Sequence, residues 1–272
     1  MKKYILDLKV RAVEHISEKH VLLHLTDHQP LPEMLPGQFV EVRVDGASNT
    51  FLRRPISINF VDRSQNELWL LVALVGEGTR RLGTLQAGDT LNCVLPLGNG
   101  FSLPDNDFSL PANSFSFPDS PSSPVHAPLL VGGGVGVAPL LYLGVTLQEQ
   151  GVEPTFLLGG RSEKDVLELD LFKKYGRVCV TTEDGSAGEK GFVTNHSVLQ
   201  EPFDYIYTCG PTPMMKAVSR YALQQGIACE ASLENMMACG LGACLCCVEK
   251  TTAGNLCVCK DGPVFPTTKL MW

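Results

Sequence analysis

Stretches in which apolar and polar residues partly alternate follow one another through the first hundred residues. Such alternation is typical of β-strands, and turn-forming pairs such as Pro36-Gly37 and Gly88-Asp89 separate the stretches. A short helix is expected over roughly 78–85. Six strands at this short spacing predict a closed antiparallel β-barrel. We expect the strands at residues 4–13, 20–27, 38–44, 54–61, 67–75 and 90–97.

From residue 128 onward the pattern changes to apolar strands that alternate with amphipathic segments. Residues 128–151 predict a strand, a glycine-rich turn and an amphipathic helix. Strands that alternate with helices predict a parallel sheet in an α/β nucleotide-binding domain. Further strands are expected at 154–160, 177–185, 203–210 and 227–234, and helices at 164–175, 194–200 and 211–225.

Residues 101–127 separate the two patterns and are rich in serine, proline, aspartate and asparagine. A segment with so little apolar surface cannot offset the entropy lost on ordering, so we expect an extended or mobile linker or insert. The predicted organisation is a β-barrel at 1–100, this linker, an α/β domain at 128–234 and a cysteine-rich subdomain at 235–272.

Composition narrows the class of protein. The 272 residues are 44% hydrophobic and 19% charged, which is typical of a soluble globular protein with two ordinary domains. The net charge of −7 argues against nucleic acid or an anionic membrane as a partner, because both bind clustered lysine and arginine. No apolar run is long enough to span a bilayer, and the charged N-terminus does not resemble a signal peptide. Ten cysteines in a chain without a leader predict a reducing, cytoplasmic location.

Six of the ten cysteines fall within residues 236–265. Three of them follow a C-x4-C-x2-C pattern, and a fourth follows after eleven intervening residues, which is the ligand spacing of a plant-type [2Fe-2S] cluster. Gly240 and Gly242 allow the loop to curl and to aim amide N–H groups at the sulfurs. The predicted ligands are Cys239, Cys244, Cys247 and Cys259.

Other uses of these cysteines fit the spacing less well. A structural zinc site prefers two C-x2-C pairs or added histidines, and a disulfide framework belongs to small secreted domains. Cys246 and Cys257 are surplus, and spacing alone leaves open an exchange with a neighbouring ligand. We choose Cys247 because it gives the x2 interval, and Cys259 because the turn at 260–263 follows it directly. We expect the two surplus thiols to be ordinary small buried side chains.

A glycine-rich turn lies where the first strand of the α/β domain leads into its first helix. Glycines at such a turn let the backbone approach a pyrophosphate, although a tight turn without a ligand is the alternative. The fourth strand ends in Cys209-Gly210-Pro211, where a cysteine could border a nicotinamide ring or simply be a buried thiol. The turn glycines are Gly132, Gly133, Gly134 and Gly136.

The barrel contains a second candidate site at Arg54-Pro55-Ile56-Ser57. An arginine beside a proline-stiffened backbone can bind a diphosphate, and the serine hydroxyl can reach the edge of a flavin ring. A surface arginine before an edge strand is the alternative interpretation. The strand Leu71-Val72-Ala73 then leads into a turn at Gly78-Thr79, which could bind a further phosphate.

Taken together, these motifs resemble the ferredoxin–NADP reductase superfamily and, with the cysteine loop, the electron-transfer subunits of type B dihydroorotate dehydrogenase. The resemblance extends over essentially the full length, except for the insert at 101–127, which is not expected in that family. It rests on RRPISI at 53–58, GEGT at 76–79, GGGVGVAPL at 132–140, KGFVT at 190–194, CGP at 209–211 and the cysteine loop.

The resemblance implies a role for each site. The cysteine loop would ligate the [2Fe-2S] cluster, and the chain would provide no catalytic acid or base. NAD would be the electron acceptor and would occupy the turn at Gly132, Gly133, Gly134 and Gly136 together with Cys209, Gly210 and Pro211. FAD would be held by Arg54, Pro55, Ile56, Ser57, Leu71, Val72, Ala73, Gly78 and Thr79.

In that family a separate FMN subunit oxidises dihydroorotate to orotate in pyrimidine synthesis. Electrons pass through the cluster to FAD and leave as hydride on NAD, in a heterotetramer with two copies of each subunit. The resemblance implies NAD rather than NADP; Glu183 and Asp184 would repel a 2′-phosphate, although Arg161 and Lys164 could bind one. The alternatives are a flavin/iron–sulfur subunit of another NAD(P)H-linked ferredoxin or sulfur reductase, and a zinc-stabilised binding module.

Overall fold

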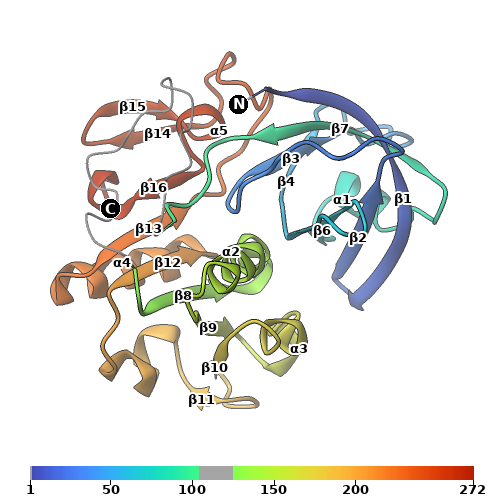
Figure 1. The fold of residues 1–272 in the computed structure, drawn as a ribbon. Helices are drawn as coiled ribbons and strands as arrows, with labels where there is room; N and C mark the ends of the chain where they lie inside the picture. The colour runs from blue at the N-terminus through green and yellow to red at the C-terminus, as the bar shows by residue number, and fades with distance from the viewer. Residues whose placement is uncertain (1, 104–124) are drawn as a thin grey trace.

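The structure, a computed structural model, describes residues 2–103 and 125–272. These residues form two seven-stranded sheets and a two-stranded hairpin (Figure 1). Residues 104–124, most of the predicted linker, lie outside the described residues. None of the helices in the described part is both long enough and apolar enough to cross a membrane.

The first sheet is antiparallel and has the strand order β4-β3-β7-β1-β2-β6-β5. In the longest strand, β1, the register shifts next to Val10 and next to His15, and bulges of this kind bend a strand around its core. Helix α1 (Glu77–Leu82) begins one residue before the predicted start. The strands are β1 (Tyr4–Ser17), β2 (His20–Thr26), β3 (Phe39–Val42), β4 (Arg54–Ser57), β5 (Phe60–Asp62), β6 (Glu67–Ala73) and β7 (Thr90–Leu97).

The strand predicted at 54–61 is divided into β4 and β5, which form the two edges of this sheet. The chain crosses between the edges at two residues: the Ile58 amide donates to Gln38 O and the Asn59 amide donates to Trp69 O, both at 3.0 Å. The predicted antiparallel barrel is therefore confirmed, but as a half-barrel. The edge strands β4 and β5 do not pair with each other, so the predicted closure is absent; the two residues Ile58 and Asn59 connect these strands instead.

The second sheet has the order β11-β10-β9-β8-β12-β13-β16 and is parallel except for its last strand. The parallel α/β sheet is thus confirmed. Its central strand β8 is apolar and completely buried, as expected for a parallel strand covered on both faces. The strands are β8 (Pro128–Gly133), β9 (Thr155–Gly160), β10 (Arg177–Thr182), β11 (Glu189–Lys190), β12 (Tyr205–Cys209), β13 (Ala228–Ser232) and β16 (Val264–Pro266).

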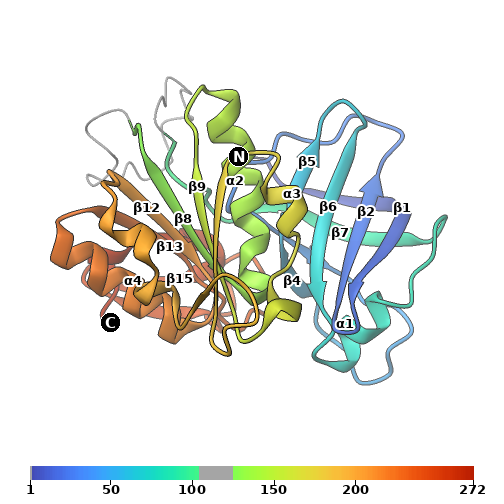
Figure 2. The same ribbon diagram turned by 90° about the horizontal axis from the view of Figure 1, so that it is seen from below.

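Helix α2 (Ala138–Glu149) lies between the parallel sheet and the half-barrel (Figure 2). The Tyr142 hydroxyl donates to Met34 O at 3.0 Å, so α2 is tied to the half-barrel as well as to its own sheet. Leu22 and Leu71 from the half-barrel join α2 and the sheet in one apolar cluster. The two sheets are therefore fixed against each other by a shared core.

Two predicted helices differ from the structure. The segment predicted at 164–175 contains only a 3-10 turn (Glu163–Asp165) and the short helix α3 (Leu169–Phe172), because Glu168 adopts a left-handed backbone with φ 55°. The segment at 194–200 forms two short 3-10 turns. Helix α4 (Thr212–Gln225) is present as predicted and packs on β12 and β13.

The C-terminal segment contacts both sheets. It forms the hairpin β14 (Val248–Thr251) and β15 (Gly254–Cys257), the short helix α5 (Val258–Asp261) and then β16, which pairs with β13. Its apolar cluster includes Phe39 and Leu97 from the half-barrel and Ala231 from the parallel sheet. The cysteine loop is consequently held at the junction of the two sheets.

Candidate functional site

The glycine turn and the end of β12 lie in direct contact. A Cβ atom on Gly136 would lie 2.4 Å from Gly210 Cα, and one on Gly133 would lie 3.3 Å from Pro211 Cδ. Contacts this close exclude a side chain, so both glycines are required for the turn to pack against the strand end. The two segments predicted to receive NAD are therefore brought together at the carboxyl edge of the sheet, where α/β proteins bind their ligands.

Only one glycine of the turn faces open space. A Cβ on Gly132 would meet Leu140 at 2.9 Å, so this residue serves the packing of α2 on β8. Gly134 has φ +56° and nothing within 4 Å of an added Cβ. An open backbone position just before a buried helix can accept a pyrophosphate, so the turn fits the predicted ligand.

The Cys209 thiol does not face that open space. The side chain is completely buried, and burial raises its pKa well above the usual range while a hydrogen bond with Ser232 lowers it. A nicotinamide at this strand end would therefore meet the backbone of Gly210 rather than a reactive thiolate. The predicted contact of Cys209 with NAD stays a prediction.

The predicted FAD segments also meet. A Cβ on Gly78 would lie 3.2 Å from Arg54 Nε, so the arginine of β4 lies against the start of α1. Thr79 Oγ1 accepts a hydrogen bond from the Gly76 amide at 3.1 Å and so stabilises the beginning of that helix. The half-exposed strand β4 and this turn form one surface.

Other residues of the predicted FAD set are structural. Val72 and Leu71 are buried in apolar clusters, so only their backbone could contact a ligand. Arg53 points into the sheet, where Nη1 donates to Glu41 O and Asn92 O at 3.2 and 3.1 Å. Arg54, not Arg53, is thus the arginine available to a ligand.

Exposed apolar side chains next to this surface were not singled out from the sequence. Phe51 is 91% exposed and precedes β4, while Val75 is 80% exposed and precedes α1. Exposed apolar groups beside a charged guanidinium suit a ligand that combines aromatic rings with phosphates. Their sequence signal is an apolar pair, Phe51-Leu52, placed immediately before the arginine motif.

The four predicted cluster ligands converge as two pairs. The Cys239 sulfur is hydrogen-bonded with the Cys244 thiol, and the Cys259 sulfur with that of Cys247. Cys247 and Cys259 are each 1% exposed, whereas Cys244 is exposed. Two pairs of thiols suit a cluster of two irons that takes four thiolates. No group of three histidine, cysteine, aspartate or glutamate side chains within 2–103 and 125–272 is already arranged around a single metal position.

Backbone N–H groups point at these sulfurs, as expected from the glycines of the loop. The Gly242 amide donates to Cys259 Sγ at 3.1 Å, and the Leu241 amide to Cys239 Sγ at 3.4 Å. Burial opposes ionisation of Cys239, but hydrogen bonds from the backbone of Leu241 and Cys244 lower its pKa to about 6. The thiolate of Cys239 is therefore stabilised before any metal is considered, whereas burial and the neighbouring Cys247 raise the pKa of Cys259 to about 12.

The surplus cysteines differ from each other. Cys257 is buried, as predicted, and its thiol donates to Gly242 O at 3.9 Å. Cys246 is exposed, so its predicted burial is wrong: the loop turns it outward between Leu245, whose φ is 59°, and the buried Cys247. The ligand choice itself stays a prediction.

Glu41 connects the cysteine loop with the predicted FAD strand. It lies opposite Pro55 in the β3–β4 register, and a Cβ on Gly240 would lie 2.7 Å from its Cγ. Glu41 is 1% exposed, and burial, offset in part by Arg53, raises its pKa to about 7. The loop therefore rests on β3, one strand away from β4.

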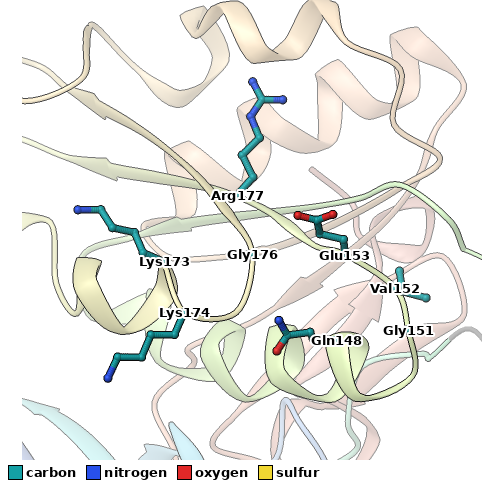
Figure 3. Close-up of a pocket in the computed structure, with 8 residues that line it drawn as sticks. All are labelled: Gln148, Gly151, Val152, Glu153, Lys173, Lys174, Gly176 and Arg177. Atoms are coloured by element: carbon teal, nitrogen blue, oxygen red, sulfur yellow. The ribbon is translucent and has the colours of Figure 1, made fainter.

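A surface pocket lies at the opposite end of the parallel sheet, where β9 and β10 begin. Three of its lining side chains, Lys173, Lys174 and Arg177, point away from one another (Figure 3). The Arg177 guanidinium is already paired with the Glu201 carboxylate. These cations do not converge on one anion, and the pocket is remote from the glycine turn.

A solved structure of an NADH-dependent reduced ferredoxin–NADP oxidoreductase, studied for flavin-based electron bifurcation, has a similar overall fold. It matches with a TM-score of 0.82 and 28% identity, covering 98% of this chain and 90% of that one. Family models also match: the oxidoreductase NAD-binding domain at residues 130–220, and the iron–sulfur cluster binding domain of dihydroorotate dehydrogenase B at 234–271. Fold and site together define an oxidoreductase of the ferredoxin–NADP reductase-like class with an iron–sulfur cluster binding domain.

The dihydroorotate dehydrogenase B (NAD(+)) electron transfer subunit of Shouchella clausii is 40% identical over 242 residues, which is 87% of this chain and 86% of that one. The subunit of the same name from Lysinibacillus sphaericus is 39% identical over 265 residues, 95% and 96% of the two chains. The chain belongs to the family of electron transfer subunits of NAD-linked dihydroorotate dehydrogenase B. The predicted family is confirmed, and with it the role as an oxidoreductase subunit.

Proposed function

We propose that this chain holds a [2Fe-2S] cluster, FAD and NAD, and carries electrons from an FMN-containing catalytic subunit to NAD in pyrimidine synthesis. The observation that carries the proposal is the position of the cysteine loop. It rests on β3 at Glu41, which lies opposite Pro55 of the FAD strand. Such a transfer requires a one-electron centre close to the flavin site, because the rate of electron transfer decreases steeply with distance.

When bound, the cluster exchanges single electrons, the nicotinamide exchanges a hydride, and the flavin can do both. The residues of the chain bind and orient these groups. Cys239, Cys244, Cys247 and Cys259 provide the four thiolates, and backbone amides such as that of Gly242 donate to the sulfurs. Hydrogen bonds to the sulfurs stabilise their negative charge and so raise the reduction potential of a cluster.

The α/β domain orients the nicotinamide cofactor. Gly134 leaves the backbone open for a pyrophosphate, and Gly210 lies against the glycine turn at Gly133. The Asp184 amide, just after β10, donates to Arg161 O, just after β9, so the segments that carry these two oppositely charged residues lie together. We propose NAD rather than NADP, and the dissociation constants of NADH and NADPH, measured side by side, test this choice.

The catalytic subunit would dock on the exposed side of the cysteine loop. Met236 is 83% exposed and Leu245 is 64% exposed, and both flank the exposed Cys244. Exposed apolar side chains grouped on one face mark a protein–protein contact. We propose a heterotetramer with two copies of each subunit, located in the cytoplasm, where ten cysteines stay reduced.

A second candidate is a flavin/iron–sulfur subunit of another NAD(P)H-linked ferredoxin reductase. The near full-length match to the NADH-dependent reduced ferredoxin–NADP oxidoreductase favours it. That match has 28% identity, however, whereas the dihydroorotate dehydrogenase B subunit of Shouchella clausii has 40%. Orotate-dependent oxidation of NADH by the chain mixed with its co-purified FMN partner separates the two. An active mixture supports the first function, and a partner that reduces ferredoxin but not orotate supports the second.

Absorption and EPR spectra of the anaerobically purified, dithionite-reduced chain test the cofactors directly. We expect flavin absorption and a paramagnetic reduced cluster with two irons and two sulfides per chain. A colourless chain that contains zinc would overturn the proposal. Cys244→Ser should remove the EPR signal while NADH still reduces FAD.

A further inference from the structure

Two polar side chains meet where the half-barrel joins the α/β domain. Asn59 lies between β4 and β5 and is completely buried, and Glu168, which is partly buried, lies immediately before α3. Asn59 Nδ2 donates to Glu168 Oε2 at 2.9 Å and to Ala138 O at 3.4 Å. This one amide therefore connects the end of the predicted FAD strand with the beginning of α2 and of α3.

Each partner of this pair carries one oxygen without a hydrogen bond. Asn59 Oδ1 and Glu168 Oε1 are shielded from solvent and have no partner among the described residues. Both hydrogens of Asn59 Nδ2 are already used, and an ionised carboxylate can only accept. An ionised Glu168 would leave two buried acceptors unsatisfied, which is costly. A protonated carboxyl removes both defects, because its O–H can donate to the amide oxygen while its other oxygen accepts from the amide N–H.

The surroundings of Glu168 oppose its ionisation. Burial raises its pKa to about 7, the hydrogen bond from Asn59 lowers it, and the Glu14 carboxylate of β1 raises it further. Within residues 2–103 and 125–272 it has no salt-bridge partner. Other titratable groups at this junction pair among themselves: His20 of β2 faces Asp165, and Asp170 pairs with Lys173.

The backbone at Glu168 is also unusual. Its φ of 55° and ψ of 24° place a non-glycine residue in the left-handed region, which interrupts the helix predicted at 164–175. Such a conformation persists only where surrounding contacts stabilise it, and it often marks a functional position. This backbone conformation places the carboxyl beside Asn59. The contact with Asn59, rather than the local sequence, therefore accounts for the left-handed turn.

We propose that Glu168 is protonated in the folded protein and pairs with Asn59 through two hydrogen bonds, as an acid–amide pair that fixes the FAD strand against the NAD-binding helix. Glu168 Oε1–H donates to Asn59 Oδ1, and Asn59 Nδ2–H donates to Glu168 Oε2. Glu168 is a positioning residue for transfer between the two cofactors, a role that rests on the proposed function. Raising the pH releases the proton to solvent, breaks one of the two bonds and loosens the junction.

The direction of the pH dependence follows from the raised pKa. A free glutamic acid ionises near 4.5, so between about pH 4.5 and 7 the folded state keeps a proton that the unfolded state has lost. Stability contributed by the pair is therefore complete at low pH and decreases as the pH rises through about 7. Glu168→Gln is the matched variant, because glutamine forms the same two hydrogen bonds without a proton to lose.

The first test is the melting temperature of the full-length holoprotein between pH 5 and 8. The difference between Glu168→Gln and wild type should grow with pH and reach about 5 °C at pH 8. Glu168→Ala should have a lower melting temperature than wild type at pH 5, and it should not show the rise relative to wild type that is expected for Glu168→Gln at higher pH. Parallel pH profiles for wild type and Glu168→Gln would overturn the proposal.

Infrared difference spectroscopy provides a second test. The spectrum of wild type minus that of Glu168→Gln at pH 6 should show the carbonyl stretch of a protonated carboxylic acid, which disappears on titration above pH 8. The subtraction removes the contribution of the Glu41 carboxyl, because burial raises its pKa to about 7 as well. A difference spectrum without that band would overturn the proposal.

The positioning role is tested by the rate at which NADH reduces bound FAD. In wild type this rate should fall about tenfold between pH 6 and 9, because misplacing a reacting group slows transfer steeply. Glu168→Gln should keep the rate at pH 6 and remove that fall, and Glu168→Ala should be slow throughout. An unchanged pH profile in Glu168→Gln would contradict the positioning role. If the chain holds no flavin, the proposed function fails, while the melting and infrared tests still decide the acid–amide pair.

Discussion

Gly136→Ala tests whether the glycine turn really lies against the end of β12. The added Cβ would be 2.4 Å from Gly210 Cα and 2.6 Å from Gly210 N, whereas ordinary contacts begin at 3.4 Å. The two backbones would have to separate by 3.4 − 2.4, or about 1 Å, and no flexible side chain can absorb that movement. Overpacking of this kind costs about 1–3 kcal/mol.

We therefore expect Gly136→Ala to lower the melting temperature by about 4–8 °C, since about 2 kcal/mol corresponds to that shift in a chain of this size. NADH affinity should fall at least tenfold, because the turn moves away from the strand end. Differential scanning fluorimetry and titration of NADH by fluorescence measure the two effects.

Two other glycines provide matched controls for this experiment. Gly134 and Gly151 both have positive φ and nothing within 4 Å of an added Cβ, so alanine at either costs only the backbone strain of about 1 kcal/mol. Gly134→Ala places its methyl group in the space proposed for the pyrophosphate and should weaken NADH binding. Gly151→Ala, beyond α2, should not. Wild-type stability and affinity in Gly136→Ala would refute the contact, and equal behaviour of the two controls would refute the pyrophosphate position.

Four further variants test separate parts of the structure. Cys246→Ser should leave the iron and sulfide content unchanged, and a loss of iron would show that the ligand assignment is misplaced. Arg53→Ala should lower the free energy of unfolding by about 2 kcal/mol, because its charged guanidinium bridges carbonyl groups of two strands, but should retain FAD. Arg54→Ala should lose FAD with little change in the stability of the apoprotein, and the opposite result for the two arginines would reverse their roles. Tyr142→Phe removes the hydrogen bond to Met34 O and should cost about 1 kcal/mol in chemical denaturation; no loss would mean that this hydrogen bond does not contribute to holding α2 against the half-barrel.

The sequence predicts the strands well because alternation and apolar runs are local properties of the chain. It does not predict where a strand bends or what it pairs with. The segment at 54–61 looks continuous, yet it crosses between the two edges of the half-barrel at Ile58 and Asn59. Likewise β16 is too short to stand out, and it becomes a strand because β13 presents a free edge to it.

Contacts with distant segments decide the environment of two residues, and the local sequence does not reveal these contacts. Alternation places Glu41 on the polar face of its strand, but the cysteine loop, about two hundred residues later, covers that face. Glu168 has an ordinary helical neighbourhood in sequence, and only its contact with Asn59 explains the left-handed backbone. Candidate cluster ligands could be selected from the sequence because three of them share one short loop, so their spacing reflects their geometry directly.

The way the C-terminal segment is attached bears on how electrons could cross the molecule. β16 pairs with β13 of the parallel sheet, and the Asn99 amide at the end of the half-barrel donates to Gly262 O at 2.6 Å. The inner cysteines, Cys247 and Cys259, share an apolar cluster with residues of both sheets. A loop attached on two sides cannot swing, so its distance to β4 is set by the fold rather than by a domain movement. With the proposed cofactors bound, transfer between cluster and flavin should then need no opening of the subunit, and the exposed side at Cys244 is accessible to a partner subunit.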